Sequence, residues 1–297
     1  MKKRFKILIA TLVVLLALCI GFIIYIAFGG GDSLFWMSYQ QSPNEIYNME
    51  SGIIYNCLEF HEGQAYKLNY DFSNQAYGEL RDKHNLVEIA QTGNEFGKAK
   101  NLMNEFSNRL THKSNYDNHI ETNALALLNY SLDNKKYGIN CRAKSQILNE
   151  MCLSLGIYAR KVWIMPISIY DSDCHVVNEI WDSSLHKWIM FDITSNMYWV
   201  DENGNPLSIL EIRDKIANQD FCTPVNPGDN LKDLKKSLNN NFDNFLYIAK
   251  NMVFMQYCDT YTTNESEKSY FLYPTNLANL ATDYDIISKE AIEASPI

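Results

Sequence analysis

The chain has 297 residues, of which 46% are apolar and 21% charged, with 19 Tyr, 14 Phe and a formal net charge of −9. This composition is typical of a folded globular protein and excludes a collagen-like or intrinsically disordered chain. Without the four cations at its N-terminus, the chain keeps 22 basic and 35 acidic residues, a net charge of −13. Such an acidic chain argues against nucleic acid as a partner and offers no polybasic surface to lipid headgroups.

An apolar run from Ile7 to Phe28 comprises 22 consecutive uncharged positions. A helix needs about 20 such residues to cross a bilayer, so we predict a transmembrane helix at residues 7–28. The basic residues before it are Lys2, Lys3, Arg4 and Lys6. No cation stands at the Gly-rich exit, so the positive-inside rule predicts residues 1–6 in the cytoplasm and the rest of the chain outside the cell membrane.

Two alternatives to a single-pass anchor stay open. Ala27-Phe28-Gly29 offers small residues for cleavage of a signal peptide, although the apolar region of a signal peptide is normally only about 7–15 residues long. Leu16-Ala17-Leu18-Cys19 resembles a bacterial lipoprotein box, although Leu18 stands where a small residue is expected.

Residues 29–76 follow as a linker and N-terminal segment without clear periodicity, and residues 77–220 form the predicted core with a helical lead-in. Apolar spacing predicts lead-in helices at 77–86, 97–110 and 123–132. A further helix is predicted from Cys141 to Leu155, with Asn140 as its N-cap and Gly156 as the glycine that ends it. A cysteine in the first turn of a helix is a candidate nucleophile, because the unpaired N–H groups and the helix dipole favour thiolate over thiol.

Strand patterns follow at Ala159–Ile169, His175–Trp181 and Lys187–Asp192. The last two read as a β-hairpin, and a two-residue turn at Ser183-Ser184 would pair His175 directly with Asp192. Opposed residues point to the same face, so the carboxylate would hold the imidazole as a base for the Cys141 thiol.

The remaining elements carry no catalytic pattern. Ser208 and Glu211 form a capping box that predicts a helix to about Ala217. Residues 221–297 are expected as a C-terminal extension, with an amphipathic helix at 229–248. No metal or other cofactor is predicted, because the histidines show no ligand spacing with one another or with cysteines.

Several short motifs together resemble the transglutaminase-like superfamily, from about residue 80 to 220. They are Asn140-Cys141-Arg142, Leu155-Gly156-Ile157, His175-Val176-Val177-Asn178-Glu179, and Trp188 before Asp192-Ile193-Thr194. The resemblance implies an α+β, papain-like fold in which a nucleophile helix packs on an antiparallel sheet. It implies Cys141 as nucleophile, His175 as base and Asp192 as the orienting carboxylate.

Two departures from the family pattern affect the expected substrate groove. Val177 replaces an aromatic residue two positions after the histidine, and Ile193 replaces the proline of an Asp-Pro-Thr motif. His175 follows Cys141 by 34 residues, far fewer than the roughly 130 of papain-type proteases, which favours the transglutaminase-like arrangement.

These observations predict an extracytoplasmic thiol acyl-transfer enzyme that hydrolyses peptide or amide bonds of a peptide or protein substrate. Two alternatives remain: a transglutaminase that cross-links proteins, and a non-catalytic binding or assembly protein of the cell envelope. The sequence does not identify the substrate.

Overall fold

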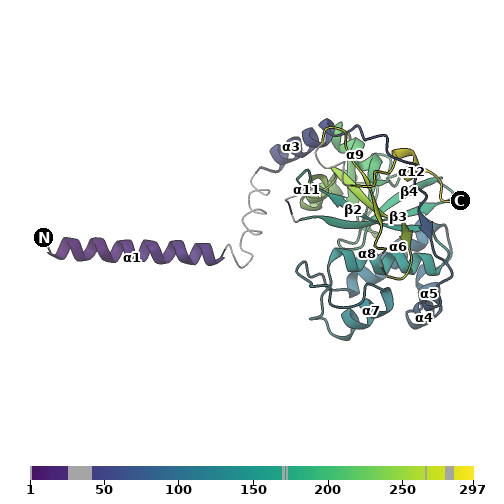
Figure 1. The fold of residues 1–297 in the computed structure, drawn as a ribbon, viewed down its shortest axis with the longest axis horizontal. Coiled ribbons are helices and arrows are strands. Elements are labelled where there is room, and N and C mark those ends of the chain that lie inside the picture. The colour runs from purple at the N-terminus through teal and green to yellow at the C-terminus, as the bar shows by residue number, and fades with distance from the viewer. Residues whose placement is uncertain (1, 26–41, 169–170, 172, 265, 278–283) are drawn as a thin grey trace. The chain divides into compact units, whose positions relative to one another are not determined.

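The computed structural model describes residues 2–25, 42–168, 171, 173–264, 266–277 and 284–297. The chain forms two compact units, Met1–Tyr47 and Asn48–Ile297. Figure 1 shows helix α1 in the first unit and a mixed assembly of helices and strands in the second.

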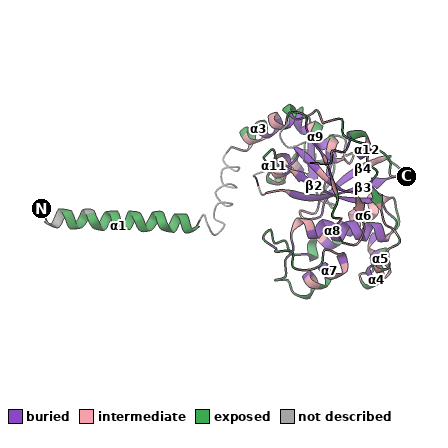
Figure 2. Ribbon diagram, viewed as in Figure 1, coloured by how far each residue is buried: buried purple, intermediate pink, exposed green. Residues whose placement is uncertain are grey.

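Helix α1 (Lys2–Tyr25) contains the apolar N-terminal run. Its stretch Phe5–Tyr25 has 21 residues and a mean hydropathy of 3.2, long and apolar enough to cross a membrane, as a signal sequence also can be. The side chains described in this stretch are exposed (Figure 2). The predicted span began at Ile7, inside α1, whereas its predicted last residues 26–28 lie outside the described part of the chain.

The described part of the second unit contains a seven-stranded sheet with the strand order β6-β5-β4-β3-β2-β7-β9. All neighbouring strands in it are antiparallel. These strands are β2 (Ala159–Met165), β3 (His175–Asp182), β4 (Lys187–Asp192), β5 (Met197–Asp201), β6 (Cys222–Val225), β7 (Phe254–Cys258) and β9 (Ser269–Leu272). The short strands β1 (Asn69–Tyr70) and β8 (Thr260–Tyr261) pair in parallel. Every residue of the central strand β3 is buried.

The helices of this unit fall into three groups along the chain. Helix α3 (Pro43–Asn56) crosses the boundary between the units. The helices before the sheet are α4 (Ala76–Lys83), α5 (Leu86–Ala90), α6 (Glu95–Arg109), α7 (Ala124–Asp133) and α8 (Cys141–Ser154). Those after β5 are α9 (Ile209–Ala217), α10 (Leu234–Asn240), α11 (Phe242–Lys250) and α12 (Lys289–Glu293). Together they give the α+β architecture that the sequence predicted, in which helix α8 packs on an antiparallel sheet.

Helix α8 is enclosed by the rest of the fold. It packs against β2 and β3 on one side and against α4, α6 and α7 on the other. All residues from Ala143 to Ser154 are therefore buried, as the purple colour of α8 in Figure 2 shows. The predicted ends of this helix are confirmed. Asn140 caps its start, and Gly156 follows its C-cap with a φ of +73°, a left-handed conformation that suits glycine.

The hairpin of β3 and β4 has a different register from the predicted one. Asp182 pairs with Lys187, so the loop has four residues rather than two. The Asp182 carboxylate stabilises this longer loop by accepting the N–H groups of Ser184 and Leu185, each at 3.0 Å. The sequence prediction missed this side-chain interaction, and the ladder is consequently shifted by two residues. A shift of two keeps every side chain on its predicted face.

Two predicted element boundaries were wrong. Strand β2 ends at Met165 because Pro166 follows and has no N–H for the ladder. The predicted end of that strand, Ile169, lies outside the described residues. The helix predicted at 77–86 ends at Lys83, and Asn85 adopts a left-handed φ of 51° before α5 begins.

The prediction of one helix at 229–248 was also wrong, because the helical segment there consists of two helices. It starts late, at Leu234, where Asp233 caps α10. It breaks at Asn241, whose side-chain amide donates to the Ser237 carbonyl at 3.0 Å and so competes with helix continuation.

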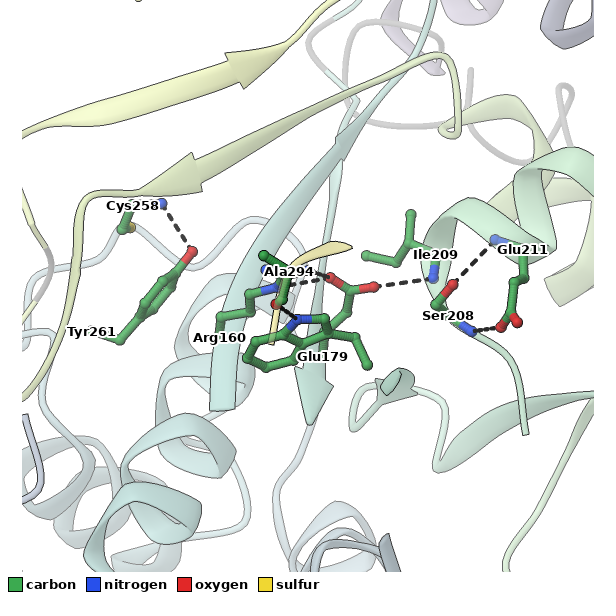
Figure 3. A network of polar contacts seen from close by, with 9 residues as sticks. Arg160, Glu179, Ser208, Ile209, Glu211, Cys258, Tyr261 and Ala294 are labelled. Atoms are coloured by element: carbon green, nitrogen blue, oxygen red, sulfur yellow. Dashed lines mark hydrogen bonds and ion pairs between the residues drawn. The ribbon is translucent and has the colours of Figure 1, made fainter. Parts of the chain in front are cut away.

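The C-terminal residues 221–297 join the sheet on both sides. Strand β6 pairs with β5, and β7 pairs with β2. Near the end of the chain, the Ala294 carbonyl accepts the indole N–H of Trp188 at 3.2 Å. This bond adjoins the buried ion pair of Arg160 and Glu179, in which the Arg160 Nη2 lies 2.6 Å from the carboxylate (Figure 3).

Candidate active site

Cys141 is the first residue of α8 and is half-buried. The Asn140 side chain accepts the Ala143 N–H at 3.0 Å, and the Asn140 carbonyl accepts the Lys144 N–H at 3.0 Å. The N–H of Cys141 itself takes part in neither bond. Because Cys141 begins the helix, its sulfur lies at the positive end of the helix dipole, where a negative charge is stabilised.

His175 begins β3 and Asp192 ends β4, on adjacent strands. The His175 Nε2 lies 3.0 Å from the Asp192 Oδ2. The other carboxylate oxygen accepts the N–H groups of Thr194 at 2.9 Å and Ser195 at 3.3 Å. Because Nε2 is engaged with the carboxylate, Nδ1 is the ring nitrogen left for the sulfur. The four-residue turn thus still brings together the histidine and the aspartate that the sequence predicted.

Burial and the neighbouring polar groups shift the pKa of the Cys141 thiol in opposite directions. Burial opposes ionisation, but a hydrogen bond with His175, the charge of that ring and the Val176 N–H together lower the pKa of Cys141. Burial also opposes a charge on His175, yet the charge and hydrogen bond of Asp192 raise the pKa of His175 to about 10. For Asp192, the charge and hydrogen bond of His175 overcome burial and lower the pKa of the carboxyl. All three directions favour a thiolate beside an imidazolium.

Two buried hydrogen bonds connect helix α8 to strand β3. The Ser145 hydroxyl donates to the Val176 carbonyl at 2.7 Å, and the Asn178 side-chain amide donates to the Ser145 carbonyl at 2.9 Å. Ser145 lies four residues after Cys141, and Asn178 lies three residues after His175. Neither residue was predicted to have a role, although their fixed spacing from the two candidates was the available signal.

Two titratable residues near the site were also missed, Lys144 and His112. Lys144 is buried, and its lowered pKa reflects first this burial, against which the charges of Asp192 and Cys141 act. The pKa of His112 is lowered by burial and then by the charges of Lys144 and His175. Lys144 follows Cys141 by three residues, a spacing that places both on one side of a helix and could have identified it.

The other cysteines differ from Cys141. Cys152 is fully buried on α8, and burial raises its pKa beyond the ordinary range. Cys174 is half-buried directly before β3, where burial and the charge of Cys141 raise its pKa to about 11. None of the seven cysteines, all at described positions, forms a disulfide. Across the described residues, no group of three or more His, Cys, Asp or Glu side chains could hold a metal ion.

Comparison with known proteins gives a family and one solved structure. Residues 84–193 match the transglutaminase-like superfamily. A candidate cysteine protease from Cytophaga hutchinsonii is similar to the chain with 18% sequence identity and a TM-score of 0.32. The similarity covers 55% of the present chain, which spans about half (52%) of the length of that protein. No curated protein matches the chain.

The matched segment contains the nucleophile helix, the β3–β4 hairpin and all three residues of the candidate site. It begins near the end of α4 and stops one residue after Asp192. Over residues 84–193, the chain therefore matches the transglutaminase-like superfamily, and the candidate site lies within this match.

Proposed function

We propose that the chain is a membrane-anchored, extracytoplasmic thiol enzyme that hydrolyses peptide or amide bonds through Cys141, His175 and Asp192. The observation that carries this proposal is the connected series of sulfur, imidazole and carboxylate at the N-terminus of α8, with the Nε2–Oδ2 distance at 3.0 Å. A buried thiol kept only for packing would not need a histidine whose other nitrogen is fixed by an aspartate.

In the first half-reaction, the Cys141 thiolate attacks the carbonyl carbon of the substrate. The oxyanion that forms lies at the start of α8, where the Cys141 N–H is the donor that this geometry offers. The His175 imidazolium then gives its proton to the leaving amine or ammonia, and the C–N bond breaks to leave a thioester on Cys141.

In the second half-reaction, neutral His175 removes a proton from water, which attacks the thioester. The C–S bond breaks, the acid product leaves, and the thiolate and imidazolium are restored. Asp192 keeps the imidazole in one tautomer and one orientation through both steps. We favour hydrolysis over amine transfer because water is abundant outside the cell, and an amine acceptor would need a binding site of its own.

Alkylation by iodoacetamide tests the proposal without knowledge of the substrate. The full-length protein in detergent is labelled at several pH values, and the modification of each cysteine is followed by peptide mass spectrometry. Cys174 is an internal control because it is half-buried like Cys141 but has a raised pKa. We expect Cys141 to react at least about ten-fold faster than Cys174 at pH 6, since thiolate is the reactive form.

Replacing His175 by Ala should remove this advantage and leave the labelling of Cys174 unchanged. Slow and equal labelling of Cys141 in both proteins would contradict an activated nucleophile and favour a binding or assembly protein. If Cys141 is activated, product analysis on a peptide mixture defines the reaction. New amino termini, or ammonia released without incorporation of an added fluorescent primary amine, support hydrolysis, whereas incorporation of that amine would indicate cross-linking.

A further inference from the structure

Helix α11, outside the segment matched by the family, places an aromatic ring against the candidate base. The Tyr247 ring lies with its centroid 5.3 Å from that of His175, at an interplanar angle of 68°. This edge-to-face arrangement is a favourable geometry for two rings. Asp192 and Cys141 contact the edge of the imidazole through its nitrogens, whereas the Tyr247 ring restricts how far the imidazole can tilt.

The same tyrosine is tied to the chain that leads into β3. Its hydroxyl donates to the Asp173 Oδ1 at 3.0 Å, two residues before His175. One turn further along α11, the Lys250 Nζ lies 2.9 Å from the Asp173 Oδ2 and 3.0 Å from the Asp171 Oδ2. Tyr247 and Lys250 thus hold the backbone on the N-terminal side of His175 while the tyrosine ring contacts its side chain.

Helix α11 has a rigid base for this contact. Its buried side chains are Phe245, Leu246, Ile248 and Ala249. At its end, the Asn251 side-chain amide donates to the Tyr247 carbonyl at 3.0 Å. Burial and the charge of Asp173 raise the pKa of Tyr247 above its ordinary value, so its hydroxyl remains a donor at neutral pH.

We propose that Tyr247 is a positioning residue for the reaction: it holds the His175 imidazole and the backbone before β3 in the orientation that the Cys141 thiol requires. This inference rests on the proposed function and extends the site to the C-terminal segment. The titratable groups around the imidazole are Asp192 on β4, Cys141 and Lys144 on α8, and His112 in the loop before α7. Tyr247 changes none of these charges, so its effect is on geometry.

The test compares Tyr247→Leu and Tyr247→Phe in the full-length protein. Leucine removes both the ring contact and the hydroxyl, and we expect the rate of Cys141 alkylation at pH 6 to fall about ten-fold, which corresponds to about 1.4 kcal/mol. Phenylalanine keeps the ring and should retain most of the rate. The pH midpoint of alkylation should rise in the leucine variant, because a misplaced imidazolium stabilises the thiolate less.

Phe242→Leu is the matched control, since Phe242 is a half-buried aromatic residue of the same helix that stacks on Phe245, with a centroid distance of 5.7 Å. It should leave the alkylation profile unchanged. Equal losses in Phe242→Leu and Tyr247→Leu would overturn the inference in favour of general loosening of α11. An unchanged profile in Tyr247→Leu would overturn it as well.

A second readout separates this inference from the proposed function. The His175 ring resonances, assigned in 15N-histidine protein with a His175→Gln variant, should shift in Tyr247→Leu and much less in Tyr247→Phe. If Cys141 of the wild type proves unreactive while these resonances still depend on Tyr247, the positioning is correct and the enzymatic proposal is wrong. Resonances that do not respond to Tyr247→Leu would refute the positioning itself.

Discussion

His175 is the residue at which opposing electrostatic effects meet. Burial favours the neutral ring, whereas the Asp192 carboxylate and the Cys141 sulfur favour the imidazolium, and the balance raises the pKa of His175 to about 10. The ordinary pKa of histidine is about 6.5, so the folded protein holds this proton more tightly than the unfolded chain does. Protonation of one ring is thereby linked to folding stability.

The sign of this linkage gives a pH prediction. Because the folded-state pKa is raised, the stabilisation from His175 is complete below about pH 6.5 and is lost as the pH rises toward about 10. The lowered pKa of Cys141 acts in the opposite sense, because its stabilisation grows as the pH rises to the ordinary pKa of a thiol, about 8.5. Only above that pH does the loss from His175 dominate. Asp192→Asn removes the carboxylate that raises the pKa of His175, so its stability should fall less than that of the wild type between pH 8.5 and pH 9.5. Urea unfolding midpoints at the two pH values measure this difference. Asp214→Asn, at a carboxylate on α9, should behave as the wild type does, and equal losses in all three proteins would contradict the linkage.

At the residue scale, sequence reasoning located the groups whose chemistry has a fixed local context. Cys141 follows a capping asparagine, and His175 and Asp192 lie at the ends of two strands joined by a short turn. Tyr247 could not be predicted in this way. It reaches His175 only because β7 pairs with β2 and so returns the chain to the site from 72 residues downstream, a contact without local periodicity.

Among the elements, helix α8 begins with a cap that both stabilises the helix and positions the Cys141 sulfur. The Asn140 side chain satisfies the Ala143 N–H and fixes the first turn, which positions the sulfur and the Cys141 N–H. Another helix of the same fold has an equivalent cap without a nucleophile: the Asn123 side chain accepts the Ala126 N–H at 2.9 Å at the start of α7. The two caps therefore allow stability and reactivity to be separated.

We expect Asn140→Ala and Asn123→Ala to destabilise the protein by similar amounts, about 1 kcal/mol each, because each loses one capping hydrogen bond. Only Asn140→Ala should slow the alkylation of Cys141 at pH 6, by about three- to ten-fold, since it also loosens the turn that favours the thiolate. Thermal unfolding and the alkylation assay measure the two effects. A similar decrease in Cys141 reactivity for both variants would show that the cap acts only through global stability.

The elements that the sequence predicted best are those with local end signals. Caps and glycine placed the ends of α8, and the capping box of Ser208 and Glu211 placed the start of α9. The hairpin register depended instead on the Asp182 carboxylate within the loop. The β3–β4 prediction was wrong by two residues in pairing but right about which side chains share a face, because strands have a period of two.

For the whole molecule, the C-terminal residues are part of the fold that supports the site. Strands β7 and β9 continue the sheet beyond β2, and β6 continues it beyond β5. Arg213 of α9 contacts the chain just before β7, where it donates to the Met252 carbonyl at 3.0 Å. It also donates to the Cys57 carbonyl. The candidate site is thus carried by a unit that extends well beyond the 84–193 segment, which explains why the alternation of strands and helices after 220 had no catalytic pattern of its own.

We propose an extracytoplasmic location for this unit from the charges at the N-terminal end of the chain. The 21-residue stretch Phe5–Tyr25 is preceded by cations, and the acidic remainder of the chain has no basic cluster to hold it in the cytoplasm. We expect an epitope tag placed after Ile297 to be digested by protease added to intact bacterial cells and to be protected in inverted membrane vesicles. Replacing the four N-terminal cations by Gln and adding three Lys after Gly31 should reduce the digested fraction in cells. A tag protected in intact cells would contradict the orientation. The intact mass distinguishes the anchor from its alternatives, because cleavage of a signal peptide after Gly29 would remove residues 1–29 and lipidation would require Cys19.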